Sequence, residues 1–155
     1  MLLRQILRNK GHEIHTISSS ESCDRAVTEL VRFNIGSLLV RDAPDGPILG
    51  IITERDILRA QASHRAPLEK LLVATVTSTE LVTAHPDDHI MVAMRLMTTH
   101  RIRHLPVFRG KELCGIVSIG DIVKAHHDEL ESDNHYMRSY IRGDVAEEAT
   151  PAAEG

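Results

Sequence analysis

Residues 50–60 read GIITERDILRA, and residues 115–125 read GIVSIGDIVKA. The two stretches lie 65 residues apart (115 − 50 = 65) and share one physical pattern. Each has a glycine, two β-branched residues that end a strand, a hydroxyl residue and, three positions later, an aspartate. A hydroxyl residue at the N-cap and a carboxylate at N3 form a capping box at a helix start. One copy predicts only a capped helix, whereas two copies in matching surroundings predict an internally repeated fold.

Both halves of the chain are predicted to run strand–helix–strand–strand–helix, because apolar residues switch between the two spacings in the same order. The first half has strands at 14–17, 36–40 and 48–52 and helices at about 22–33 and 54–63. The second half has strands at 81–84, 105–107 and 115–117, a cap at 85–88 and helices at 89–100 and about 120–142. A short helix over 2–8 precedes the first half, and a helical turn at 68–72 joins the two.

The fold class expected from this order is α/β (α+β), with two tandem repeats and a long C-terminal helix. We expect repeat one at 1–66, repeat two at 67–127, a helix extension at 128–143 and a disordered acidic tail at 144–155. The long helix has an apolar stripe made of Val123, Leu130, Met137, Tyr140 and Ile141 on an otherwise charged surface. That stripe indicates packing either against another subunit or back onto its own repeat.

Composition narrows the functional classes. The net charge of −4 divides into −6 for residues 128–155 and +2 for residues 1–127, so the chain lacks the basic stripe of a nucleic-acid binder. No run of about 18 apolar residues is present, and arginines interrupt the N-terminal apolar stretch, so neither a membrane span nor a signal peptide is expected. The two cysteines, Cys23 and Cys114, form no C-x-x-C pair, which predicts free thiols and a cytoplasmic location.

The doubled unit, whose last strand runs into G-[IV]-[IV]-[ST]-x-x-D, resembles the CBS domain (named for cystathionine β-synthase). The likeness covers about residues 1–127 and is strongest to stand-alone bacterial proteins that consist of one CBS pair. The resemblance implies that the two repeats pack as a pseudo-twofold pair with two clefts. It also implies an adenosine-containing ligand in those clefts, such as AMP, ADP, ATP, NAD or S-adenosylmethionine.

The resemblance also implies a role for individual residues, position by position. Asp56 and Asp121 would accept hydrogen bonds from the ribose hydroxyls, and Thr53 and Ser118 would stand at helix starts that favour phosphate. The backbones of Thr16, Ile17 and Ser18, and of Thr83, Ala84 and His85, would meet the adenine edge. The R-H-x-P-V pattern of Arg103, His104 and Pro106 would bring positive charge to the phosphates. In repeat one, Gly36 and Ser37 replace the two cations, and Arg55 replaces Gly120. We therefore expect unequal clefts, with the phosphate-rich ligand beside Asp121.

Plainer interpretations stand beside these. His104 could be a strand histidine, Arg103 a surface cation, and Arg55 the partner of Glu54 or Asp56. The pairs His85/His89 and His100/His104 straddle predicted helix boundaries, so no metal site is expected.

The expected function is that of a non-enzymatic sensor which binds an adenine nucleotide, forms a homodimer and signals to a protein target that the sequence does not name. The alternatives are a structural dimerisation module without a ligand and an S-adenosylmethionine binder. We expect no catalytic residues and no nucleic-acid or membrane partner.

Overall fold

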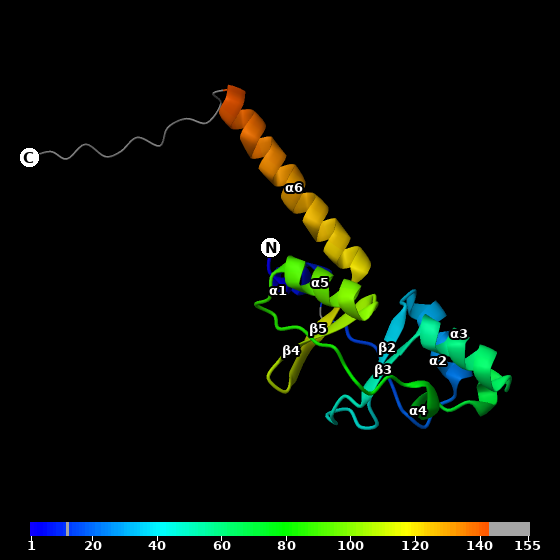
Figure 1. The fold of residues 1–155 in the computed structure, drawn as a ribbon. Helices are drawn as coiled ribbons and strands as arrows, with labels where there is room; N and C mark the ends of the chain where they lie inside the picture. The colour runs from blue at the N-terminus through cyan, green and yellow to red at the C-terminus, as the bar shows by residue number, and fades with distance from the viewer. Residues whose placement is uncertain (12, 143–155) are drawn as a thin grey trace, which may run out of the picture.

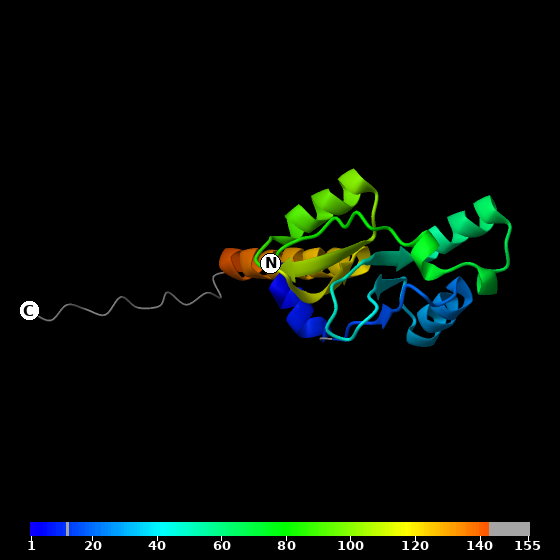
Figure 2. The same cartoon turned by 90° about the horizontal axis from the view of Figure 1, so that it is seen from below.

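The computed structural model describes residues 1–11 and 13–142, and the two repeats lie side by side in it (Figures 1 and 2). Repeat one comprises β1 (Thr16–Ile17), α2 (Cys23–Phe33), β2 (Ser37–Val40), β3 (Gly50–Thr53) and α3 (Glu54–His64). Repeat two comprises α5 (Ile90–His100), β4 (His104–Arg109), β5 (Glu112–Ser118) and α6 (Ile119–Arg142). The helix α1 (Leu3–Lys10) precedes both, and the 3-10 helix η1 (Leu68–Lys70) and α4 (Val73–Val76) join them. The predicted element order is thus confirmed for repeat one, and for repeat two except for its first strand.

Each repeat has its own small sheet. In repeat one the strand order is β1-β2-β3, with β1 parallel and β3 antiparallel to β2. In repeat two β4 and β5 pair antiparallel, with His104 opposite Ser118. The strand predicted at 81–84 is reduced to one parallel bridge between Ala84 and Val107, because only Ala84 exchanges backbone hydrogen bonds with β4.

The helices begin where side chains satisfy their free N–H groups. Thr53 and Asp56 form a complete capping box at the start of α3, and Ser22 accepts a hydrogen bond from Arg25 N (3.1 Å) at the start of α2. The predicted cap of α5 at 85–88 is wrong. The N-cap is His89, since the Asp88 carboxylate instead accepts the His85 N–H (2.7 Å) and closes the preceding turn.

Each of the two hydrophobic cores includes residues that come from outside the strands and helices of its own repeat. The core of repeat one contains Leu71 and Val73, which come from the connection between the repeats. The core of repeat two contains Leu3, Ile6 and Leu7 of α1, which lies before repeat one in the sequence. A division of the chain at residue 66 therefore separates the repeats in sequence without separating their cores.

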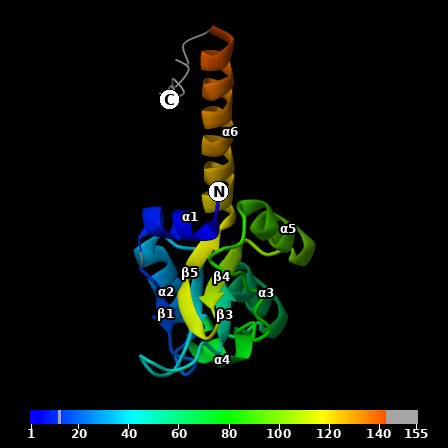
Figure 3. The same ribbon diagram turned by 90° about the vertical axis from the view of Figure 1, so that its left-hand side faces the viewer.

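The last helix, α6, has 24 residues and rises out of the globular body (Figure 3). Its first turns pack against α5 and β5, where Ile122 and Ala125 are buried. The tail predicted at 144–155, and residue 143 of the predicted extension, lie outside the described residues. Within the described part of the chain, no helix is both long and apolar enough to cross a membrane.

The fold predicts that Gly50→Ala is destabilising. A Cβ at residue 50 would lie 2.5 Å from the carbonyl oxygen of Ser78, a backbone atom that cannot move aside without breaking the Ile51–Ser78 bridge. We expect a loss of about 1–3 kcal/mol in the free energy of unfolding, measured by urea denaturation. The matched control is Gly120→Ala, whose Cβ would meet only Ser118 Oγ at 3.7 Å and which should be neutral or stabilising. Equal losses in the two variants would contradict the predicted clash.

Candidate functional site

A cleft of about 390 Å³ lies between the two repeats. One wall comes from the end of α1 and the residues that follow it, Lys10, Gly11 and Glu13–His15. A second wall comes from residues 33–37, where α2 ends and β2 begins. The third comes from repeat two, with His104 on β4 and Gly115, Ile116 and Ser118 on β5. The volume is within the range of about 300–1,000 Å³ that small-molecule pockets usually have.

The carboxylate of Asp121 lies beside this cleft in a network of charge-assisted hydrogen bonds. Its Oδ2 accepts from the backbone N–H of Ser118 (2.7 Å) and from Lys10 Nζ (2.7 Å). Lys10 also donates to the carbonyl of Ile116 (3.3 Å), so α1 is tied to β5 at this point. Burial alone would raise the pKa of Asp121, but the bonds from Lys10 and Ser118 outweigh it and hold the pKa below its ordinary value. Asp121 is therefore ionised at neutral pH.

The His104 side chain enters the cleft close to the backbone of Gly36. A Cβ on residue 36 would lie 2.9 Å from His104 Cε1, so the absence of a side chain at Gly36 makes room for the imidazole. Burial, and then the positive charge of Lys10, lower the pKa of His104. The ring is consequently neutral at pH 7 and offers one donor and one acceptor. Lys10 brings a full positive charge to the cleft.

The opposite side of the cleft offers flat and apolar surface. The ring of His15 stacks on that of Phe33, with centroids 4.0 Å apart and planes 25° from parallel. Ile14 and Ile35 line the same region. A planar, partly apolar group therefore finds apolar contact on one side of the cleft and charged hydrogen-bond partners on the other.

The sequence-predicted residues separate into two groups. Ser37, His104 and Ser118 line the cleft, and Asp121 is bonded to its lining residue Lys10. Thr16, Ile17 and Ser18 do not line it; Ile17 is buried in the core of repeat one, and Ser18 Oγ donates to Asp42 (3.0 Å). Their neighbours Glu13–His15 take that place. The contribution of Lys10 and Phe33 was not predicted from the sequence.

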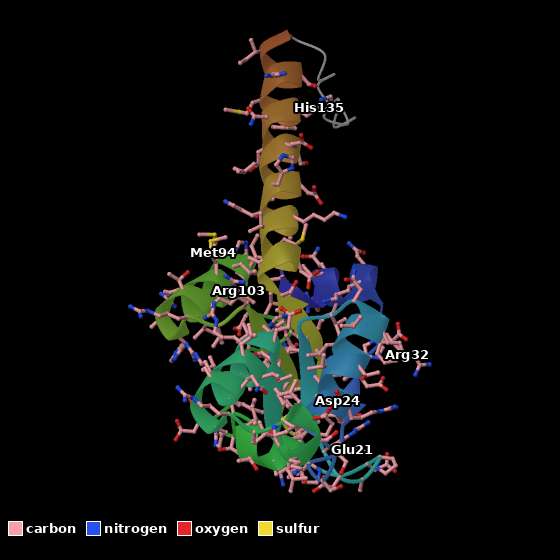
Figure 4. The ribbon with its side chains drawn as sticks, turned by 90° about the vertical axis from the view of Figure 1, so that its right-hand side faces the viewer. Glu21, Asp24, Arg32, Met94, Arg103 and His135 are labelled. Carbon is pink, nitrogen blue, oxygen red and sulfur yellow. The ribbon has the colours of Figure 1, made fainter. Side chains whose placement is uncertain are left out.

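Repeat two supplies two further predicted residues that lie away from the cleft. Pro106 is buried within β4. Arg103 is exposed and lies beside the base of α6, where its carbonyl accepts the Ile119 N–H (2.8 Å) (Figure 4). Neighbouring residues on an extended backbone point in opposite directions, so the orientation of His104 into the cleft turns Arg103 away from it.

The corresponding aspartate of repeat one has different surroundings. Asp56 Oδ2 accepts from the backbone N–H (2.9 Å) and the hydroxyl (2.7 Å) of Thr53, and no ion pair to it is found in the described residues. Arg55 extends to repeat two and donates to the Arg101 carbonyl (3.4 Å) instead of pairing with its neighbours. Thr83 and His85 are exposed, and Ala84 is held in its bridge to β4. The two aspartates of the repeated motif are thus unequal in charge environment.

The described residues contain one grouping of possible metal ligands, His127, Asp128 and Glu131, all exposed on α6. Helix periodicity alone brings residues three and four apart together, so this grouping does not indicate a metal site.

Comparisons of the sequence with known proteins all point to the CBS-domain family. The sequence pattern of the CBS domain matches residues 5–63 and 73–128. The chain is 38% identical over 120 residues to the CBS domain-containing protein CBSX3, mitochondrial, of Arabidopsis thaliana, covering 73% of this chain and 58% of that one. It is 34% identical over 111 residues to the CBS domain-containing protein YhcV of Bacillus subtilis, covering 71% of this chain and 76% of that one. The chain thus spans little more than half the length of the Arabidopsis relative.

Two solved structures are also similar. The CBS-domain containing protein ATU1752 of Agrobacterium tumefaciens has a TM-score of 0.78 and 35% identity, covering 81% of this chain and 99% of that one. The CBS domain pair of protein MJ0100, in complex with 5′-methylthioadenosine and S-adenosyl-L-methionine, has a TM-score of 0.72 and 27% identity, covering 83% of this chain and 98% of that one.

The site geometry predicts that Lys10→Met raises the pKa of Asp121, because the variant removes both the ammonium hydrogen bond and its charge. Carboxyl NMR titration of Asp121 measures the change. The control is Lys111→Met, on the exposed hairpin between β4 and β5, which should leave Asp121 unchanged.

The same contact predicts how the free energy of unfolding changes with pH. A carboxyl with a depressed folded pKa stabilises the fold above its unfolded pKa, about 4, and that contribution is lost as the pH falls through the folded pKa. Lys10→Met should reduce this loss below pH 4. An unchanged Asp121 titration in Lys10→Met would contradict the ion pair.

Proposed function

Because the chain belongs to the CBS-domain family, we propose that the cleft beside Asp121 binds an adenosine-containing ligand and that the protein is a non-enzymatic regulatory module. The observation that carries the proposal is an ionised carboxylate at the edge of a cleft between the repeats, next to a lysine and opposite an apolar wall. Of the related structures, MJ0100 has adenosine-containing molecules bound to its CBS pair.

Each part of such a ligand finds a matching group. The Asp121 carboxylate accepts hydrogen bonds from the ribose hydroxyls, and bonds to a charged acceptor are worth about 1.5–3 kcal/mol each. The adenine ring contacts the apolar side made by Ile14 and Phe33, and its polar edge lies along the backbone of residues 13–15. Phosphate oxygens meet Lys10 and the positive end of the α6 helix dipole.

Lys10 has a particular role in this binding mode. In the free protein its ammonium neutralises Asp121. A phosphorylated ligand offers Lys10 a second negative partner, so the ammonium can bridge ribose carboxylate and phosphate. A ligand without an anionic group offers only the ribose and must compete with Lys10 for Asp121. The cleft should therefore prefer AMP, ADP, ATP or NAD to 5′-methylthioadenosine.

The aspartate of repeat one should bind such a ligand less tightly. Among the described residues Asp56 has no lysine beside it, and Arg55 is engaged with the carbonyl of Arg101. A second site at Asp56 would thus lack the cation that favours phosphate. We infer one dominant site per chain.

Signalling follows from the position of α1. Its last residue contacts the ligand cleft, while its apolar face lies in the core of repeat two. Occupancy of the cleft changes the partners of Lys10, and a ligand shifts the protein between two states by its difference in affinity for them. The readout is a partner protein or the assembly of the chain itself.

The proposed function predicts stabilisation by adenosine-containing ligands. A ligand at 100 times its dissociation constant adds about 2.7 kcal/mol to the free energy of unfolding, which amounts to a few degrees in the melting temperature. Thermal shift should be compared for AMP, ADP, ATP, NAD, S-adenosylmethionine and 5′-methylthioadenosine, with GMP and IMP as controls. If ligand-stripped protein responds to none of the adenosine compounds at millimolar concentration, the chain is a structural module and the proposal fails.

Calorimetric titration of three variants tests the site itself. Asp121→Ala removes the ribose acceptor and should weaken binding by about 2–4 kcal/mol, or roughly 30- to 1,000-fold. Asp56→Ala is the matched control, because both aspartates occupy N3 of a helix and both changes should cost about 1 kcal/mol of stability. Lys10→Met should weaken AMP binding but not 5′-methylthioadenosine binding. Loss of binding in Asp56→Ala but not in Asp121→Ala would reverse the assignment of the dominant cleft.

A further inference from the structure

The outer part of α6 is a helix without a packed face. The body covers one side of its first turns, where Ile122 and Ala125 are buried and Glu129 contacts the N-terminal amino group. From residue 130 to residue 138 every side chain is exposed. Figure 3 shows this part standing clear of the body, and Figure 4 shows His135 far from both repeats. Isolated helices this short are marginal in water, so the outer turns of α6 need a partner that the chain does not provide.

The exposed apolar residues of α6 follow a seven-residue interval. Val123, Leu130 and Met137 are 57%, 50% and 60% exposed, and Ile141 is 80% exposed. An apolar seven-residue repeat is the pattern of a coiled coil, because it keeps one seam facing a partner helix. A coiled-coil seam uses two positions in each heptad, a and d. The second position can lie on either side of the apolar stripe, four residues before or four residues after each apolar residue.

The packing of α6 against the globular body shows which of the two sides is accessible to a partner helix. The residues that precede each apolar position by four, such as His126 before Leu130, include side chains turned toward the body, since His126 is half-buried. The residues four positions after each apolar one are His127, Asn134 and Ile141, and all three are exposed. A partner helix therefore approaches over the second set, with Val123, Leu130 and Met137 at d and His127, Asn134 and Ile141 at a.

We propose that α6 pairs with α6 of a second copy of this chain as a parallel, in-register, two-stranded coiled coil along these a and d positions. The partner is a second copy because the seam is complementary to itself. Both bodies then lie at the same end of the coil. The inference does not depend on which ligand the cleft binds.

Asn134 sets the direction and the register. In a parallel pair a positions face a positions, so Asn134 meets its counterpart and the two amides can bond to each other. In an antiparallel pair a faces d, and Asn134 would lie against Leu130 or Met137 of the partner with its amide oxygen unpaired. Within one chain Asn134 Nδ2 donates to the Leu130 carbonyl (3.2 Å), which leaves that amide oxygen available.

The charges that flank the seam agree with the parallel arrangement. In a parallel pair a g residue lies near the e residue five positions later in the partner. Asp133 at g is then opposite Arg138 at e. Opposite charges at these positions favour the pairing of two identical helices in register.

The first test is the mass of the full chain by light scattering at about 50 μM, a concentration at which an interface with a dissociation constant near 1 μM is mostly occupied. We expect twice the chain mass of 17.3 kDa. The double variant Leu130→Glu, Met137→Glu should return the mass to that of one chain, with far-UV circular dichroism and melting of the body to show that it is folded. Ser132→Glu, on the outer face of the same helix, is the control and should remain dimeric. A monomeric wild type, or a double variant that stays dimeric, overturns the proposal.

The second test determines direction. Met137→Cys in a Cys114→Ser background is treated with a short bismaleimide, and Ser132→Cys in the same background is the control. A parallel coil brings residue 137 next to its counterpart, so we expect cross-linked dimer from Met137→Cys at least tenfold faster than from Ser132→Cys. A dimer by light scattering whose residue 137 cross-links no faster than residue 132 rules out the parallel, in-register seam.

Discussion

The packing of α1 against the core of repeat two is the contact on which the arrangement of the molecule depends. Leu3, Ile6 and Leu7 are buried there although α1 precedes repeat one in the chain. Gly115 permits the approach, because a Cβ at that residue would lie 2.7 Å from Leu7 Cδ2. Since α1 is held against β5, its C-terminal residue Lys10 is held beside Asp121. The same burial that joins the repeats therefore also sets the charge at the cleft.

The fold was largely predictable because local sequence patterns specify its helices and strands and because these patterns occur twice. Apolar spacing identifies α2, α3 and α5, and the hydroxyl and aspartate of the repeated motif mark where α3 and α6 begin. What the pattern could not show is the partner of each apolar face. Leu3, Ile6 and Leu7 indicate that α1 is buried on one side, but nothing local distinguishes the core of repeat two from that of repeat one. The strand expected at 81–84 was overpredicted because alternation does not reveal how many residues find a hydrogen-bonding neighbour.

The site was predictable where its chemistry lies within one motif. Ser118, Asp121 and His104 were identified from the doubled stretch and from the segment before β4, and they lie at the cleft. Lys10 was not, because a lysine at the end of a short surface helix has no local signal of a role. Phe33 was missed for the same reason, since its stacking on His15 depends on how α2 ends beside the segment after α1. Residues brought in by tertiary packing need the structure to be found.

One difference between the repeats lies within the motif itself. Repeat one has Arg55 where repeat two has Gly120, and each choice has a physical consequence. The guanidinium of Arg55 reaches the carbonyl of Arg101, the residue that caps the C-terminus of α5, where the helix dipole favours a cation. Repeat one thus uses its charge to couple the two repeats. Gly120 leaves the start of α6 open, and the positive charge near Asp121 comes from α1 instead. The same position of the repeated motif therefore contributes a contact to the other repeat in one copy and no side chain in the other.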